Sequence, residues 1–154
     1  MTHIAPADLG DIPQLTALEE QSFSCDRISR RQFRYLMTKA NSIVVKAEHN
    51  GMLTGYMVLL RRKTSRKLRI YSIGVTPSAR NQGIARTMIT YAEEMATKNN
   101  CCKLTLEVCE HNSAAVQLYK NTGFHQYGLK KNYYEDGCTA LLLQKNLVPK
   151  DTIP

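Results

Sequence analysis

The chain has 154 residues, of which 43% are hydrophobic and 22% are charged, with 21 Lys and Arg against 13 Asp and Glu. This length fits one domain of the usual size of roughly 100–200 residues, and the composition excludes extensive disorder. No apolar run approaches the ~18 residues that span a membrane, and the N-terminus carries no secretory pattern. We therefore expect no membrane association and a cytoplasmic location.

The cysteines and the charge pattern narrow the class of protein further. Five cysteines, two of them adjacent at Cys101 and Cys102, favour reduced thiols and lack the C-x-x-C spacing of zinc sites, so we expect no metal. Residues 27–69 hold twelve Lys and Arg and one acidic residue, densest between Arg61 and Arg69. We interpret that run as a solvated hairpin tip. The alternative is a basic RNA- or ribosome-binding module, although interleaved aromatic residues are missing.

The predicted elements begin with two helices, continue with antiparallel strands and end in a β-α-β-α-β-β order. Ser29, followed by Gln32, forms a capping box before an apolar stripe at helical spacing. Asn50-Gly51 favours a tight hairpin, and Gly123 ends a helix in the left-handed conformation. In chain order we expect helices 11–23 and 30–39, strands 42–47, 53–61 and 67–75, helix 83–97, strand 103–109, helix 112–120, and a hairpin of 124–133 with 138–146. This order predicts an α/β (α+β mixed) fold, in which helices cover both faces of a mostly antiparallel central sheet.

The connection after strand 67–75 is a candidate anion site. A turn of small residues leads directly into the helix, whose first N–H groups are unpaired and lie at the positive end of the helix dipole. Gly83 and Ala85 allow a phosphate to approach the backbone, and Arg80 and Arg86 add positive charge. The alternative is an ordinary strand-to-helix connection that needs small residues for packing.

Several motifs here resemble those of a known family. The segment Arg80-Asn81-Gln82-Gly83-Ile84-Ala85 resembles the Arg/Gln-x-x-Gly-x-Gly/Ala signature of the GNAT acetyltransferase superfamily. The matching motifs that follow in order are Leu106-Glu107-Val108, Asn112-Ser113-Ala114-Ala115, Leu118-Tyr119, Gly123-Phe124 and Lys131-Asn132-Tyr133-Tyr134. Together they are similar to the protein N-terminal acetyltransferases, which include the ribosomal-protein alanine N-acetyltransferases.

This resemblance implies a GNAT-like fold and an acetyl-CoA site. Strand 67–75 would bulge near Ile73-Gly74 and splay from strand 103–109, leaving the backbone of Ile73 and Val75 free to bind acetyl-CoA as the co-substrate. The implied cofactor-binding residues are Ile73, Gly74, Val75, Arg80, Asn81, Gln82, Gly83, Ile84, Ala85, Arg86, Asn112 and Tyr119.

The resemblance also implies catalytic and acceptor-binding residues. Glu107 matches the position of a general base and Tyr119 that of a general acid, while Phe23, Tyr133 and Tyr134 lie where the family binds its acceptor. The residues alone leave other roles open. Glu107 could face solvent, and the three tyrosines could serve packing only.

The implied activity is the transfer of an acetyl group to a primary amine. The favoured acceptor is a protein or peptide N-terminus, with ribosome-associated proteins as one source; the alternative is a small-molecule amine or a lysine side chain. We expect residues 1–154 to form a single acetyltransferase domain. Within it, residues 1–40 would form the acceptor side, 67–122 the acetyl-CoA-binding core and 147–154 a flexible tail.

Overall fold

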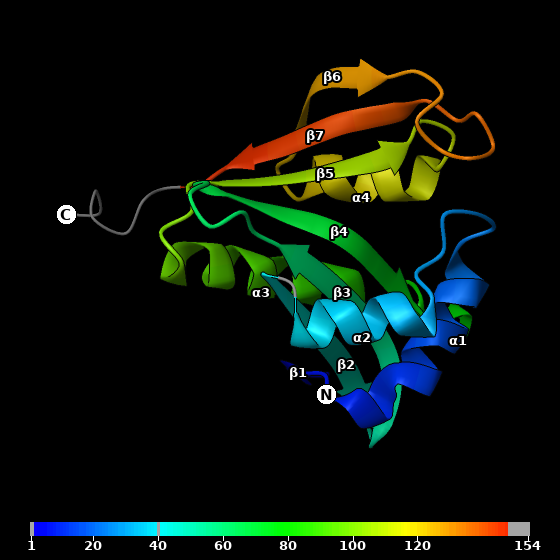
Figure 1. Ribbon diagram of the computed structural model, residues 1–154. Coiled ribbons are helices and arrows are strands. Elements are labelled where there is room, and N and C mark those ends of the chain that lie inside the picture. The colour runs from blue at the N-terminus through cyan, green and yellow to red at the C-terminus, as the bar shows by residue number, and fades with distance from the viewer. Residues whose placement is uncertain (1, 40, 148–154) are drawn as a thin grey trace.

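The chain forms a seven-stranded sheet with helices packed on it (Figure 1). The structure is a computed structural model that describes residues 2–39 and 41–147, so the expected tail lies outside the described residues except for Leu147. The predicted mixed α/β fold is confirmed. The elements are β1 (His3–Pro6), α1 (Ile12–Ser22), α2 (Arg30–Thr38), β2 (Ser42–His49), β3 (Met52–Leu60), β4 (Lys67–Val75), α3 (Ile84–Lys98), β5 (Lys103–Cys109), α4 (Ser113–Asn121), β6 (His125–Lys130) and β7 (Ala140–Asn146).

The strands are arranged in the order β1-β2-β3-β4-β5-β7-β6. Every neighbouring pair is antiparallel except β4 and β5, which are parallel. The sequence patterns predict β4 and β5 with their observed bounds, but they miss β1. That strand has four residues and ends at Pro6, so it offers little alternation, and a proline is tolerated there because β1 is an edge strand.

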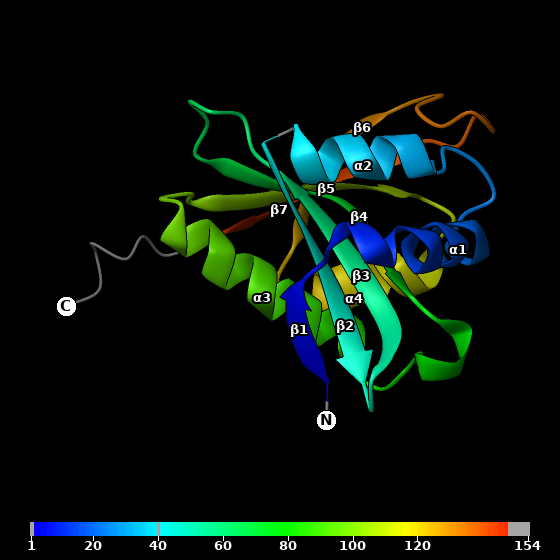
Figure 2. The same cartoon turned by 60° about the horizontal axis from the view of Figure 1, so that its bottom comes forward.

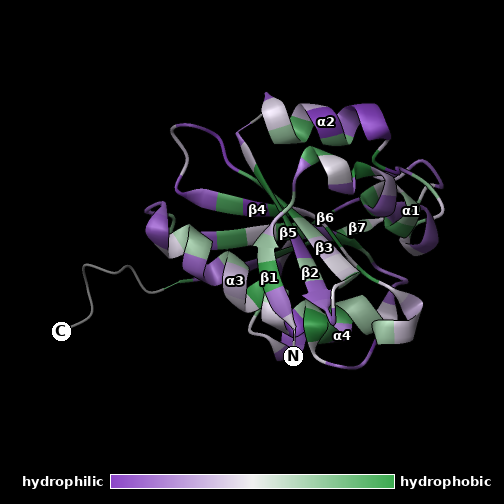
Figure 3. Cartoon of the chain, turned by 90° about the horizontal axis from the view of Figure 1, so that it is seen from below, coloured by the Kyte–Doolittle hydropathy of each residue, from purple (hydrophilic) through white to green (hydrophobic). Residues whose placement is uncertain are grey.

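The helices cover both faces of the sheet, as predicted. One core places Leu15 of α1 and Phe33 of α2 against Tyr56 of β3, while the other places Met88 of α3 against Leu104 of β5. Figure 2 shows α1 and α2 on one side of the strands and α3 on the other. Figure 3 shows the N-terminal part of α2 in the hydrophilic colour, as expected for the exposed end of a helix that buries only one stripe.

Local signals account for the element ends. The Ser29 Oγ accepts from the Gln32 N–H at 3.1 Å, and the Gln32 Oε1 accepts from the Ser29 N–H at 2.8 Å, which is the predicted capping box. Asn50 and Gly51 both adopt positive φ, at 53° and 78°, as a type I′ hairpin turn requires. These signals act within a few residues, which is why they can be read from the sequence.

The parallel strands β4 and β5 separate halfway along their length. Their pairing runs from Lys67–Lys103 to Ile70–Leu106, after which the two strands diverge (Figure 1). The extra residue on β4 is Tyr71, where the register with β3 shifts. The bulge expected near Ile73-Gly74 is therefore displaced, although the splay itself is present.

Gly74 has a packing role that explains why a glycine occurs beyond the bulge. A Cβ at this position would lie 2.6 Å from the Tyr56 ring, so only glycine lets β4 pass that side chain.

Within residues 2–39 and 41–147, no helix has the length and apolarity needed to cross a membrane.

Candidate active site

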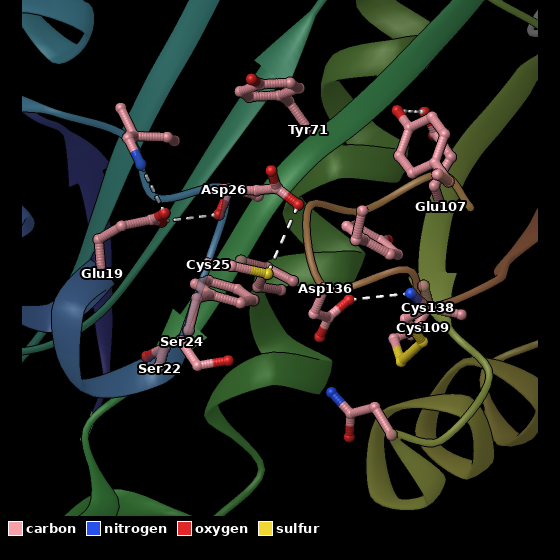
Figure 4. Close-up of a pocket in the computed structure, with 18 of the residues that line it drawn as sticks. Glu19, Ser22, Ser24, Cys25, Asp26, Tyr71, Glu107, Cys109, Asp136 and Cys138 are labelled. Carbon is pink, nitrogen blue, oxygen red and sulfur yellow. Dashed lines mark hydrogen bonds between the residues drawn. A yellow bond between two sulfur atoms is a disulfide. The ribbon is translucent and has the colours of Figure 1, made fainter.

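A cavity of about 470 Å³ opens where β4 and β5 separate. Its walls come from the end of α1, the loop before α2, the two diverging strands, the start of α4 and the loop between β6 and β7. Figure 4 shows Glu19, Ser22, Ser24 and Cys25 facing Glu107, Cys109 and Cys138 across it. The residues lining it are Glu19, Ser22, Phe23, Ser24, Cys25, Asp26, Ile28, Arg69, Ile70, Tyr71, Ser72, Ile73, Glu107, Val108, Cys109, Asn112, Tyr133, Tyr134, Asp136 and Cys138.

Glu107 lies in this cavity with both carboxylate oxygens engaged. The Arg69 guanidinium donates to it through two nitrogens, Nη2 to Oε1 and Nε to Oε2, the second at 3.2 Å. The Tyr133 hydroxyl donates to Oε1 at 3.0 Å. Glu107 therefore faces the cavity, and charge-assisted hydrogen bonds fix its orientation.

Tyr133 and Tyr134 form an edge-to-face pair, with ring centroids 4.9 Å apart, at the cavity wall. Burial, reinforced by the Glu107 carboxylate, raises the pKa of the Tyr133 hydroxyl. Burial likewise raises the pKa of Tyr134. Both hydroxyls therefore remain protonated at neutral pH, so Tyr133 acts as a donor toward Glu107.

Glu19 fixes the opposite wall. Its side chain is 1% exposed, and its Oε1 accepts from the Tyr56 hydroxyl and from the Ser72 Oγ, the latter at 3.0 Å. Its Oε2 accepts from the Ile28 N–H at 3.0 Å. A buried carboxylate is tolerated only when it is paired in this way, and the bonds attach α1 and the loop after it to β3 and β4.

Two contacts hold the loop between β6 and β7 over the cavity. Asp26, in the loop before α2, accepts from the Glu135 N–H at 3.1 Å. Cys138 in the β6–β7 loop forms a disulfide with Cys109 of β5, with the Cα atoms 6.0 Å apart. Two predicted features, the β5 strand and the final hairpin, bring the pair together, because Cys109 lies opposite Ala140 in the register. The expectation of reduced thiols is therefore wrong for Cys109 and Cys138, whereas Cys25, Cys101 and Cys102 are free.

The backbone of β4 offers hydrogen-bonding groups on the donor side of the splay. The Thr76 N–H donates to the Thr54 oxygen at 2.9 Å. Thr54 and Thr76 therefore form a hydrogen-bonded pair in the antiparallel β3–β4 ladder. Bonded and non-bonded pairs alternate in an antiparallel ladder, so Ile73 and Val75 direct their backbone groups away from β3 and toward β5. Pairing with β5 has already ended there, which leaves a strand edge that an extended ligand can complete.

The N-terminus of α3 provides an open cradle beside that edge. Gly83 adopts φ +80° and caps the 15-residue helix, and the space that its Cβ would occupy is open beyond its neighbours in the chain. Arg80 and Arg86 are exposed nearby in the chain, and the Arg80 Nε donates to the Val75 oxygen at 3.3 Å. Free helix N–H groups, open space and two cations suit a pyrophosphate.

The candidate residues divide into two groups. Glu107, Ile73, Asn112, Phe23, Tyr133 and Tyr134 line the cavity, whereas Gly74, Val75, residues 80–86 and Tyr119 do not. Tyr119 is buried on α4 against Phe124, with ring centroids 5.6 Å apart. Burial raises its pKa, so its hydroxyl is protonated at neutral pH. The Asn112 Oδ1 caps α4 by accepting from the Ala115 N–H at 3.2 Å.

Sequence reasoning missed several residues of the cavity, Arg69 above all. The hairpin-tip interpretation of the basic run is wrong for this residue, which lies inside β4 with its side chain on Glu107. Strand alternation offered a signal, since Arg69 falls between the buried Leu68 and Ile70. Glu19, Asp26 and Asp136 had no sequence signal, because their partners are distant in the chain. Within the described ranges, no group of three or more His, Cys, Asp or Glu side chains could hold a metal ion.

Comparisons with known proteins identify the family of this chain. The model of the acetyltransferase (GNAT) family matches residues 11–124. The N-alpha-acetyltransferase RimI of Mycobacterium tuberculosis is 28% identical over 140 residues, covering 88% of this chain and 87% of that protein. The ribosomal protein bS18-alanine N-acetyltransferase of Escherichia coli is 32% identical over 65 residues, or 42% of this chain and 44% of that protein.

Solved structures share the fold. The ribosomal-protein-S18-alanine N-acetyltransferase from Escherichia coli superposes with a TM-score of 0.85 at 21% identity, covering 100% of this chain and 99% of that one. A NatC complex bound to Gag peptide and CoA superposes with a TM-score of 0.82 at 22% identity, covering 96% of this chain and 99% of that one. The family model spans well over half of the chain. The chain therefore belongs to the GNAT family of acetyltransferases and is an N-acetyltransferase.

Proposed function

We propose that this enzyme transfers the acetyl group of acetyl-CoA to the α-amine of a protein or peptide N-terminus. The observation that carries the proposal is Glu107, a carboxylate fixed inside a cavity at the point where β4 and β5 separate. Two relatives support the acceptor class, since one is named a ribosomal protein bS18-alanine N-acetyltransferase and the other an N-alpha-acetyltransferase. A ribosomal protein is accordingly one candidate acceptor.

Several features beside the cavity support acetyl-CoA as the donor. Ile73 and Val75 would hydrogen-bond the pantetheine arm through the free edge of β4, with Gly74 between them. Residues 80–86 would bind the pyrophosphate at the N-terminus of α3, and Asn112 would contact the arm from the start of α4. When bound, this co-substrate supplies the activated acetyl thioester.

On the acceptor side, residues of this chain would orient the amine and move its proton. Phe23, Tyr133 and Tyr134 would contact the first residues of the acceptor. Glu107 would accept the ammonium proton, directly or through a water, because a protonated amine is no nucleophile. Tyr119, whose hydroxyl stays protonated, would donate to the departing sulfur.

A small-molecule amine is the second candidate acceptor. The cavity is lined by Glu19, Asp26, Glu107 and Asp136 against one cation, Arg69, so it favours acceptors with more than one positive charge. A spermidine N-acetyltransferase chimera shares the fold with a TM-score of 0.81 at 18% identity. A polyamine would therefore fit the charge of the cavity as well as a peptide with a basic residue near its N-terminus does.

The experiment compares acceptors at equal concentration. Release of free CoA thiol from acetyl-CoA is followed with Ala-, Ser- and Met-initiated peptides, with the same peptides blocked at the α-amine but carrying an internal lysine, and with spermidine. The proposal predicts turnover of the free N-terminal peptides, with mass spectrometry placing the acetyl group on the α-amine. Preferred turnover of spermidine or of the blocked lysine peptides would contradict it.

A further inference from the structure

The side chain of Arg69 lies where it can control Glu107. Its guanidinium contacts both oxygens of that carboxylate, and its Nη2 also donates to the Tyr133 hydroxyl at 3.1 Å. The same guanidinium carbon lies 5.2 Å from the centroid of the Tyr71 ring. An arginine held by a two-point ion pair, a hydroxyl and an aromatic face has little rotational freedom, so it is a rigid support for its partner.

The bonding pattern leaves the carboxylate with one open position. An ionised carboxylate has about four lone-pair sites on two oxygens. Within residues 2–39 and 41–147, Oε1 accepts from Arg69 and from Tyr133, whereas Oε2 accepts from Arg69 alone. Only Oε2 therefore retains a free lone pair for a further donor such as an ammonium group or a water molecule.

The backbone explains why Arg69 reaches this position. In the parallel ladder Arg69 lies opposite Thr105, and Glu107 follows two residues later on β5, so the two side chains are diagonal neighbours on one face. The β4–β5 ladder ends at Ile70–Leu106, one residue after the pair of Arg69 and Thr105. The ion pair therefore lies where the two strands separate and the cavity opens. The two side chains are 37% and 18% exposed, so solvent screens the pair only in part.

We propose that Arg69 is a positioning residue for acetyl transfer, which together with Tyr133 occupies Oε1 of Glu107 and presents Oε2 as the atom that receives the acceptor's proton. The inference rests on the proposed function, because it assigns Arg69 a role only through Glu107. It requires no contact between Arg69 and acetyl-CoA.

The test is a double-mutant cycle on turnover. Arg69→Gln removes the two-point contact, Glu107→Gln removes the proton acceptor, and the double variant combines them. If Arg69 acts through Glu107, Arg69→Gln lowers kcat by roughly 10-fold to 100-fold, a part of the about 10²–10⁴-fold that a positioned base contributes. It changes acceptor KM less than about threefold, and it has no further effect in the Glu107→Gln background, because residues that act as one unit are not additive.

Matched variants separate positioning from folding. Arg66→Gln is the control, since Arg66 is exposed and its Nε donates to the Asn100 oxygen, at 3.4 Å. Arg69→Lys keeps the charge but has no planar fork, so it should recover less than half of the lost kcat. Thermal melting of each variant with and without acetyl-CoA reports on folding and donor binding. If Arg69→Gln does not fold, Arg69→Lys takes its place in the cycle.

The results that overturn the proposal are distinct from those that overturn the proposed function. Equal and additive losses from Arg69→Gln in both backgrounds would show that Arg69 acts independently of Glu107. Unchanged kcat in Arg69→Gln, or full recovery in Arg69→Lys, would also overturn the positioning role. The cycle is run with whichever amine the parent enzyme acetylates, so failure of peptide acceptors contradicts the proposed function and leaves the test of Arg69 intact.

Discussion

The disulfide between Cys109 and Cys138 should contribute measurably to stability. The bond joins residues 29 positions apart, closing a loop that contains the end of β5, all of α4 and β6, and the cavity-lining β6–β7 loop. Closing a loop of this length in the unfolded chain is worth about 3.5 kcal/mol in the chain-entropy treatment. A chain of this size shifts its melting temperature by roughly 2–4 °C per kcal/mol, so Cys138→Ser should melt about 7–14 °C lower than the parent in non-reducing buffer.

The assay is thermal and urea unfolding followed by circular dichroism, with and without a thiol reductant. Reductant should lower the melting temperature of the parent to that of Cys138→Ser and leave the melting temperature of the variant unchanged. Cys25→Ser is the matched control, because Cys25 lines the same cavity but is a free thiol, and its effect should stay within about 0.5 kcal/mol. The reasoning would be refuted if the parent and Cys138→Ser had the same melting temperature in non-reducing buffer. A reductant effect of the same size in the variant would also refute it.

Three further outcomes test other parts of the structure. Glu19→Ala should reduce the free energy of unfolding by about 3 kcal/mol, because it leaves buried donors unpaired. The control Glu20→Ala, at an exposed neighbouring position, should change this free energy by less than about 0.5 kcal/mol, and urea titration measures both variants. Gly83→Glu should abolish the stabilisation by acetyl-CoA, which is about 2.7 kcal/mol at 100 times its dissociation constant. Gly51→Glu is the control and should retain this stabilisation, since Gly51 has a similar positive φ and similarly open surroundings in a remote turn. Tyr119→Phe should lower kcat by about 10²–10⁴-fold with little change in acetyl-CoA affinity; equal losses in both would indicate packing alone.

Much of the candidate site could be predicted because it follows the chain locally. The small-residue turn before α3, the cap of α4 at Asn112 and the alternation that turns Glu107 toward one face depend on neighbours a few residues away. Motif resemblance then indicated the donor side of the site. The positions of Phe23, Tyr133 and Tyr134 at the cavity wall agree with that expectation, while their contacts with an acceptor stay predictions.

The rest depends on residues that meet only after folding. Arg69 and Glu107 are 38 positions apart, Tyr56 and Glu19 are 37 apart, and Asp26 and Glu135 are 109 apart, so no local pattern relates the members of any pair. The same holds for the disulfide, which forms because the register of β5 with β7 brings two unremarkable cysteines to one end of the sheet.

The sequence by itself determined the order of the helices and strands after β1, most element bounds and the family signature, because capping, turn and alternation signals are encoded over a few residues. It could not decide that β4 takes its extra residue at Tyr71, that Arg69 of the basic run pairs with Glu107, or that Gly74 gives room to Tyr56. Those outcomes depend on packing and pairing between strands and helices distant in the chain. Burial makes each unpaired charge or overlapping atom costly, so the tertiary structure selects the partners.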